Sequence, residues 1–162
     1  MKIYAVRNGT VIKNGSELEA VIHELIPLSL AMGVRVGRFD GNLLELNAPL
    51  EPNINHQLSA FGGSLTALSA LTGWGLTQLL LGKLGLTGNT VVTHSEASFL
   101  RPVRSEIVCR SRLPDTTDVF ERNLKNTGRA ELALATEIVN KEGIAMTTLS
   151  RFVVHGKHRE KT

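Results

Sequence analysis

The stretch LSAFGGSLTALSALTGWGLTQLLLG, residues 58–82, carries no charged side chain and is the strongest indication of the fold in this sequence. The apolar positions that share one helical face in it are Phe61, Leu65, Leu68, Leu76 and Leu79. We therefore predict a helix over about residues 60–84, with Gly73 and Gly75 as candidate positions for a bend. The length would suit a membrane span, but serine, threonine and glutamine side chains and five glycines are spread along it. This composition favours a helix enclosed by protein over one that faces lipid.

Two helical patterns and a hairpin precede this stretch. Ser16-x-x-Glu19 forms a capping box, and apolar residues at helical spacing follow it, so an amphipathic helix is expected from about residue 17. Pro27 ends or kinks that helix, and a second short helical turn is expected from Pro27 to Gly33. Residues 34–39 and 43–50 alternate like paired strands joined by a turn at residues 40–42, and residues 2–13 are a weaker candidate hairpin about Asn8-Gly9.

Four more strand patterns follow, at about residues 90–100, 105–113, 129–140 and 144–155, while residues 118–126 suit either a short helix or a loop. A helix, two strands, a long apolar helix and four strands describe one antiparallel sheet that can curl around the apolar helix. The order therefore predicts the α+β class and the hotdog fold.

Composition and charge limit the class of protein. The chain has 162 residues, 42% hydrophobic and 20% charged, without repeats or linkers, so we expect one domain over 1–162 with its core at about 17–155. Its net charge of +3 is too small to indicate nucleic-acid binding, and the basic tail 155–161 is interpreted as a solvated terminus. The single cysteine, Cys109, excludes an intramolecular disulfide and a multi-cysteine zinc site, and we expect it to be buried. We expect no metal or cofactor, no signal sequence and a cytoplasmic location.

Three motifs carry a family resemblance: PNINH at residues 52–56, SAFGGSL at 59–65 and LTGWG at 71–75, with SFLRPV at 98–103 downstream. With these, residues 17–155 resemble the thioesterase family that forms the C-terminal domain of YiiD-type proteins. The resemblance implies a hotdog subunit that dimerises, with acyl-thioester sites at the subunit interface and the N-terminus of the long helix facing the thioester. Some relatives carry an acetyltransferase domain ahead of this one, and we expect no such activity from the roughly 16 residues before the first helix here.

The candidate site lies at the start of the long helix. A thioester carbonyl gains negative charge when attacked, and backbone N–H groups in the first turn of a helix have no intrahelical acceptor. Gly62 and Gly63 fall in this turn and would let substrate approach closely, or else they only allow the helix to pack tightly on the sheet. We assign Gly63 a catalytic role, and Gly62 and Phe61 contact with the substrate.

Polar residues on either side of the glycines complete the candidate catalytic set. Asn53 and Asn55 could hold water or the carbonyl group, and His56 could accept a proton near neutral pH, although asparagines also form turns and His56 could be a packing residue. The Ser64 hydroxyl could bind substrate or satisfy local backbone.

Carboxylates are absent from residues 52–82, where many hotdog thioesterases carry an Asp or Glu as nucleophile or base. Polarisation alone, His56 or a residue of a partner subunit would have to replace it. Glu96, with His94 on the same face of its strand, is the nearest alternative, although a solvent-facing pair is the simpler interpretation.

Four arginines, at positions 101, 104, 110 and 112, lie around Pro102 and on the following strand. Guanidinium groups suit the phosphates of coenzyme A or the acidic surface of an acyl carrier protein, so Arg101 and Arg104 are candidate substrate-binding residues. Alternation on a solvent-facing strand explains the arginines equally well.

Three functions fit these residues. The first is hydrolysis of an acyl thioester of coenzyme A or of an acyl carrier protein. The second is decarboxylation of a malonyl-type thioester, whose enolate needs oxyanion stabilisation but no base that activates water. The third is a module that binds acyl thioesters without turnover. In each case we expect a homodimer or a higher homo-oligomer.

Overall fold

The computed structural model describes residues 10–156 of the chain. The candidate hairpin about Asn8-Gly9 and the basic tail beyond Gly156 lie outside the described residues. Six strands form one antiparallel sheet in the order β1-β2-β4-β5-β6-β3. The strands are β1 Arg35–Phe39, β2 Leu43–Ala48, β3 Gly88–Phe99, β4 Ile107–Arg112, β5 Arg129–Asn140 and β6 Gly143–Gly156. The helices are α1 Gly15–Leu25, α2 Pro27–Ala31, the 3-10 helix η1 Glu51–Asn53, α3 Gly62–Lys83 and α4 Asp118–Thr127.

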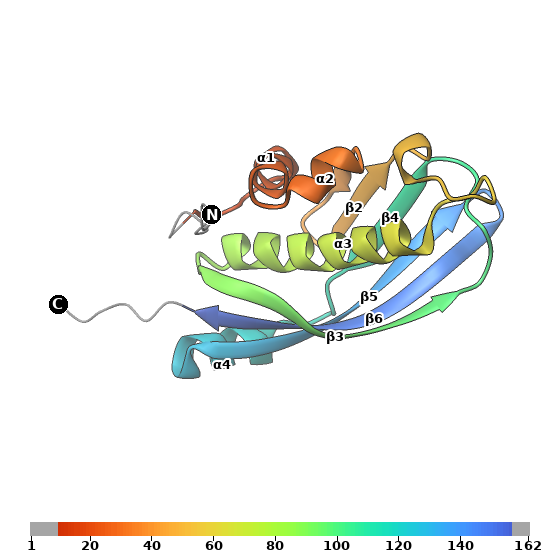
Figure 1. Cartoon of the computed structure of the whole chain (residues 1–162). Coiled ribbons are helices and arrows are strands. Elements are labelled where there is room, and N and C mark those ends of the chain that lie inside the picture. Colours follow the sequence, from red (N-terminus) through yellow and green to blue (C-terminus); the bar gives the residue numbers. More distant parts are fainter. Residues whose placement is uncertain (1–9, 157–162) are drawn as a thin grey trace.

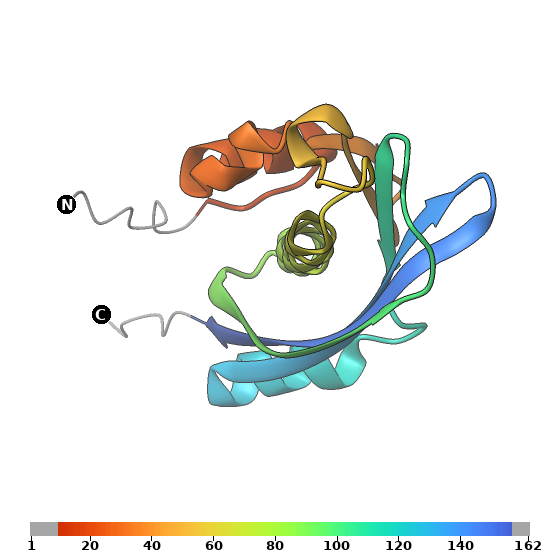
Figure 2. The same cartoon turned by 45° about the vertical axis from the view of Figure 1, so that its right-hand side comes forward.

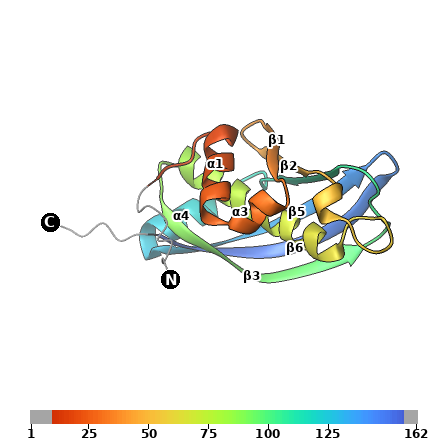
Figure 3. The same cartoon turned by 45° about the horizontal axis from the view of Figure 1, so that its top comes forward.

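The sheet curls around α3, which is seen end-on in Figure 2 inside the curve. Helices α1 and α2 lie over α3 on the side that the sheet leaves open (Figure 3). Helix α4 packs on the convex side of the sheet, against β5 and β6 (Figure 1). The α+β class and the hotdog arrangement of sheet and helix are thus confirmed.

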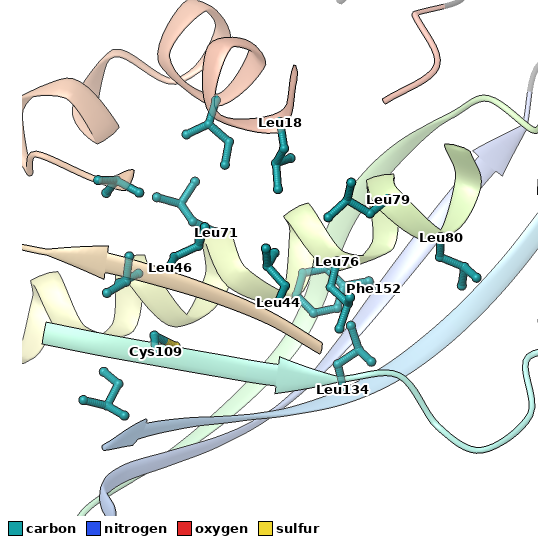
Figure 4. Close-up of a cluster of buried hydrophobic side chains, with 14 of the residues drawn as sticks. Leu18, Leu44, Leu46, Leu71, Leu76, Leu79, Leu80, Cys109, Leu134 and Phe152 are labelled. Atoms are coloured by element: carbon teal, nitrogen blue, oxygen red, sulfur yellow. The ribbon is translucent and has the colours of Figure 1, made fainter. Parts of the chain in front are cut away.

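Helix α3 is buried over most of its length, because side chains from α1, from the sheet and from the helix itself surround it (Figure 4). Two glycines allow this close approach. A Cβ at Gly73 would lie 2.5 Å from Cε2 of Phe152 on β6, and one at Gly75 would lie 3.0 Å from Leu18 of α1. The helix runs unbroken through both positions, so these glycines accommodate neighbouring side chains and do not end the helix.

The threonine hydroxyls of α3 are satisfied inside the helix. Thr72 donates to the carbonyl of Leu68 at 2.8 Å, and Thr77 donates to that of Gly73 at 2.9 Å, and both threonines are fully buried. A buried hydroxyl with a backbone acceptor avoids the desolvation cost of an unpaired one. The most apolar 18-residue window of this helix is 67% buried, which confirms a helix enclosed by protein.

Two local predictions were wrong. The N-cap of α1 is Asn14, whose side chain accepts from the N–H of Glu17, while Glu19 of the expected capping box accepts from the N–H of Val36 on β1. Phe61 does not share the buried face of α3: it is the N-cap residue with an extended backbone, and its side chain is 57% exposed. Residues 118–126, left open as helix or loop, form α4, which ends at Gly128 in the left-handed conformation.

Candidate active site

Three connections meet at the end of the molecule where α3 begins: residues 51–61, the β3–β4 connection 100–106 and the β5–β6 turn (Figure 1). Backbone hydrogen bonds join them. The N–H of Ala60 donates to the carbonyl of Val103 at 2.7 Å, and the N–H of Leu100 donates to that of Ala145 at 2.8 Å. The segment that leads into α3 is therefore fixed against the β3–β4 connection, which is in turn bonded to the start of β6.

The first turn of α3 offers free backbone donors. No side chain caps the helix, and its first intrahelical bond runs from the N–H of Leu65 to the carbonyl of Phe61 at 3.1 Å. The N–H groups of Gly62, Gly63 and Ser64 have no acceptor among the described residues. Three converging donors and the positive end of the helix dipole make this turn suitable for an oxyanion.

Two phenylalanine rings flank the glycine pair. A Cβ at Gly63 would collide with the ring of Phe61 and lie 2.8 Å from its Cζ, whereas one at Gly62 would lie 3.4 Å from Cε1 of Phe99 on β3. Both rings are 57% exposed. The donors are therefore bordered by apolar surface that is open to solvent, as an acyl group requires.

Asn53 lies in the interior and holds the entry segment in place. Its side-chain Nδ2 donates to the carbonyls of Met32 and Pro49, each at 2.8 Å, and the residue is 2% exposed. Its backbone carbonyl accepts from the N–H of Phe61 at 2.8 Å. Its Oδ1 is buried without a hydrogen-bond partner. This geometry favours a positioning role over direct contact with substrate.

Asn55 organises the tight loop that carries His56. Its Oδ1 accepts from the N–H groups of Gln57 and Ser59 at 2.8 and 3.2 Å, and its Nδ2 donates to Ser59 Oγ at 3.2 Å. Leu58 in this loop has φ +58°, which makes it the one non-glycine residue of 10–156 in the left-handed region. His56 is exposed at the loop tip.

The Ser64 hydroxyl is not used by local backbone, contrary to the simpler interpretation of this residue. It makes no hydrogen bond with the described residues, whereas Thr66 donates to the carbonyl of Gly62 at 2.9 Å. Ser64 is half-buried next to the free donors. Its hydroxyl is thus available to a ligand at the first turn.

The four arginines separate into two pairs. Arg101 donates to the carbonyl of Glu142 at 2.5 Å and Arg104 to that of Gln57 at 3.1 Å, so both lie at the end of the molecule where α3 begins. Arg110 pairs with Glu137 at 3.0 Å. It alternates with the fully buried Cys109, so Arg110 and Arg112 lie on the convex face of the sheet, away from α3. They do not join the other pair.

His94 and Glu96 form an exposed pair, Nε2 to Oε1 3.3 Å. Ser95 bonds the buried Ser150 at 2.8 Å on the face toward α3, so its neighbours His94 and Glu96 point away from α3. In the same subunit this pair is directed away from the helix entrance. No carboxylate of residues 10–156 hydrogen-bonds the segment 53–64.

Cys109 is fully buried and confirms its expected packing role. Burial raises the pKa of its thiol, partly opposed by the hydroxyls of Thr72, Ser69 and Thr136. A neutral buried thiol is a poor nucleophile. Within residues 10–156 no group of three His, Cys, Asp or Glu side chains could hold a metal ion.

Sequence reasoning did not assign Phe99 to the site, although the motif at 98–103 contains it. The antiparallel register of β3 with β6 places Phe99 opposite Met146, near the start of α3. A long-range register of this kind leaves no signal in local sequence. The same holds for the carbonyl of Val103, which fixes Ala60.

Fold and site together define a hotdog protein of the class that processes acyl thioesters. Residues 15–156 match the sequence profile of the family described as "Putative thioesterase (yiiD_Cterm)", and the chain belongs to this family.

Solved structures agree. A protein of unknown function from Chlorobaculum tepidum superposes with a TM-score of 0.84 at 27% identity, covering 88% of this chain and 94% of that one. A protein from Shewanella oneidensis, described as a "putative thioesterase", superposes with a TM-score of 0.79 at 28% identity, covering 86% of this chain and 96% of that one. A Pseudomonas aeruginosa protein of unknown function gives 0.78 at 20% identity, covering 91% and 100%, which supports the fold alone.

Proposed function

We propose that this protein hydrolyses an acyl thioester carried on coenzyme A or on an acyl carrier protein. The observation that carries the proposal is the uncapped first turn of α3, where the N–H groups of Gly62, Gly63 and Ser64 have no acceptor among the described residues. Membership of the thioesterase family supplies the substrate class.

In the proposed reaction the thioester oxygen lies against the Gly63 N–H and its neighbours. These donors stabilise the negative charge that develops when water attacks the carbonyl carbon, and the thiolate then leaves. His56, exposed at the tip of the loop before α3, is the titratable side chain within residues 53–64 and is assigned the role of the base. A residue of a partner subunit is the alternative base.

The other site residues have supporting roles in this proposal. Asn53 and Asn55 position the entry to α3 through the hydrogen bonds described above. Phe61 and Gly62 contact the acyl group, the Ser64 hydroxyl adds a donor, and Arg101 and Arg104 bind the carrier.

We also propose that the protein is a homodimer or higher homo-oligomer, associated through β3. This strand is at the edge of the sheet, and each of residues 91–100 is exposed. The exposed residues include Val91, Val92, Phe99 and Leu100. A long edge strand that is unpaired on its outer side and carries exposed apolar side chains is a surface that proteins normally cover. Sedimentation should therefore give a mass above the 17.6 kDa of one chain, and a folded monomer at micromolar concentration would contradict this assembly.

Decarboxylation of a malonyl-type thioester is the second candidate. It is favoured by one observation: no carboxylate of residues 10–156 bonds the segment 53–64, and decarboxylation needs no base to activate water. Binding without turnover is the third, and stabilisation by an acyl thioester that is never consumed would select it.

The decisive experiment measures thiol release across acetyl, malonyl, medium-chain and long-chain thioesters, with product masses to separate hydrolysis from decarboxylation. Gly63→Val keeps the backbone N–H but adds a branched side chain where the thioester oxygen should lie, so turnover should fall by about 100-fold, the scale seen when oxyanion stabilisation is lost. Any side chain at 63 meets the ring of Phe61, which is exposed and can move, so folding should survive. Lys83→Ala, at the opposite end of α3, is the control.

His56→Ala then separates the mechanisms. Hydrolysis with an imidazole base should fall by about 100-fold, whereas decarboxylation should depend more on Asn55. Normal turnover by a folded Gly63→Val protein would place the site elsewhere.

A further inference from the structure

A pocket of cationic character lies beside the candidate active site. Its volume is about 300 Å³, and its lining comes from the β3–β4 connection and the β5–β6 turn. The lining residues are Pro102, Arg104, Ser105, Asn140, Lys141 and Glu142.

The pocket shares a wall with the helix entrance. Arg104 reaches across to the carbonyl of Gln57 at 3.1 Å, in the loop that precedes α3. The carbonyl of Val103, adjacent to Arg104 in the chain, accepts from the N–H of Ala60, two residues before Gly62. Only a short segment of backbone therefore separates the pocket from the first turn of α3, so one extended ligand could contact both.

The cations around this pocket are not neutralised by carboxylates. Arg101 and Arg104 donate to backbone carbonyls, and none of the four ion pairs within residues 10–156 includes Arg101, Arg104 or Lys141. The arrangement on the convex face is different, because the pocket beside Arg110 contains Glu137, which pairs with that arginine. One carboxylate, that of Glu142, opposes the cations in the pocket at the active-site end.

We propose that this pocket binds the phosphate group that connects the pantetheine arm of the substrate to its carrier. The anchored guanidinium group of Arg104 and the ammonium group of Lys141 suit a phosphate, and the Ser105 hydroxyl supplies a neutral donor. The phosphate is chemically shared by coenzyme A and by the phosphopantetheine arm of a carrier protein. This inference rests on the proposed function, since that function supplies the pantetheine substrate.

Direct binding tests the pocket without requiring turnover. Titration calorimetry compares coenzyme A, 4′-phosphopantetheine and pantetheine, which lacks the phosphate. The unmodified protein should bind 4′-phosphopantetheine at least about tenfold more tightly than pantetheine, because hydrogen bonds to a charged group are worth more than about 1.4 kcal/mol.

Two variants change the charge of the pocket in opposite directions. Lys141→Ala should weaken binding of 4′-phosphopantetheine by about tenfold, Glu142→Gln should strengthen it, and neither should alter binding of pantetheine. Lys83→Ala removes the same charge at the far end of the 22-residue helix α3, about 30 Å away, and should change nothing. Equal affinity for pantetheine and 4′-phosphopantetheine, or equal effects of Lys141→Ala and Lys83→Ala, would overturn the proposal.

Two further arms identify the carrier and keep the proposed function separate. If coenzyme A and 4′-phosphopantetheine bind equally tightly, the pocket recognises only the phosphate next to pantetheine. Binding of an acyl carrier protein is then compared with and without its phosphopantetheine arm, to test whether a carrier protein supplies this phosphate. If coenzyme A binds more tightly than 4′-phosphopantetheine and Lys141→Ala does not weaken its binding, the proposal that this pocket binds the phosphate is contradicted. Turnover of an acyl N-acetylcysteamine thioester, which has no phosphate, tests hydrolysis itself. If this thioester is not hydrolysed but 4′-phosphopantetheine still binds more tightly than pantetheine, the proposed hydrolase activity is rejected and the proposed phosphate pocket is not.

Discussion

Replacing Gly73 with alanine should destabilise the protein, because the new methyl group has no space. The Cβ would lie 2.5 Å from Cε2 of Phe152, about 1 Å inside normal contact. Phe152 is 1% exposed and cannot swing into solvent. Overpacking of this kind costs about 1–3 kcal/mol, and the better helix propensity of alanine returns about 1 kcal/mol. Because the buried ring of Phe152 cannot move away, the upper part of that range applies, about 2–3 kcal/mol, which leaves a net loss of about 1–2 kcal/mol in the free energy of unfolding.

Urea unfolding followed by circular dichroism measures this loss, with Gly62→Ala as the matched control. A Cβ at Gly62 meets Phe99 at an ordinary 3.4 Å, so this variant should stay within about 0.5 kcal/mol of the unmodified protein. Phe152→Leu removes ring atoms that the methyl would strike. The double variant should therefore recover about 1 kcal/mol relative to the sum of the single changes. If Gly73→Ala is as stable as the unmodified protein, or if Phe152→Leu gives no recovery, the close packing of α3 on β6 is not what requires glycine.

Three smaller predictions concern single residues. Leu58→Gly should raise the free energy of unfolding by about 1 kcal/mol in urea, because Leu58 holds φ +58°, and no gain would show that the loop is not strained. Cys109 is buried and burial raises the pKa of its thiol, so it should react with a thiol reagent only as fast as urea unfolds the protein. A labelling rate of the native protein that rises steadily up to pH 9 would contradict this burial. The N–H groups of Leu43 and then Asn42 hold the pKa of Asp40 below 3.8, so the stabilisation that this carboxylate provides is present above that value and is lost as the pH falls through the folded-state pKa. Asp40→Asn should therefore be less stable than the unmodified protein at pH 7 and not at pH 2, as measured by urea unfolding at both.

The sequence predicted the order of elements well because each has its own period. Alternation along residues 129–140 matches the bounds of β5, and the uncharged run 58–82 contains nearly all of α3. Element ends were harder to predict where capping has several solutions. Asn14 and Ser16 can both cap a helix chemically, and the structure uses Asn14 because Glu19 is drawn away to the N–H of Val36. That contact spans 17 residues and has no signature near residue 16.

The candidate site was predictable in its position along the chain and less so in its contacts. The glycine pair and the asparagines came from short motifs, and these motifs do lie at the start of α3. The roles of the asparagines depend on acceptors far away, because Met32 lies 21 residues from Asn53. For a similar reason, the sequence could not separate the arginines proposed to bind phosphate from the two that lie on the other face of the sheet. Strand alternation sends Arg110 and Arg112 to the convex face, while Arg101 and Arg104 lie in a connection that has no alternation.

The composition of α3 reconciles two opposite demands on one helix. Residues 65–82 must be surrounded by protein, so they carry no charge, keep their threonine hydroxyls bonded to the helix backbone and use glycine where Phe152 and Leu18 approach. The first turn has no side-chain cap, and the proposed function requires that it stay open. A serine or aspartate at position 61 would satisfy one of the free N–H groups and compete with a ligand for it. Phe61 cannot do so, and its exposed ring instead borders the donors with apolar surface. An uncapped helix start costs about 1 kcal/mol relative to a capped one, a loss that the proposed binding of substrate at the free donors would explain.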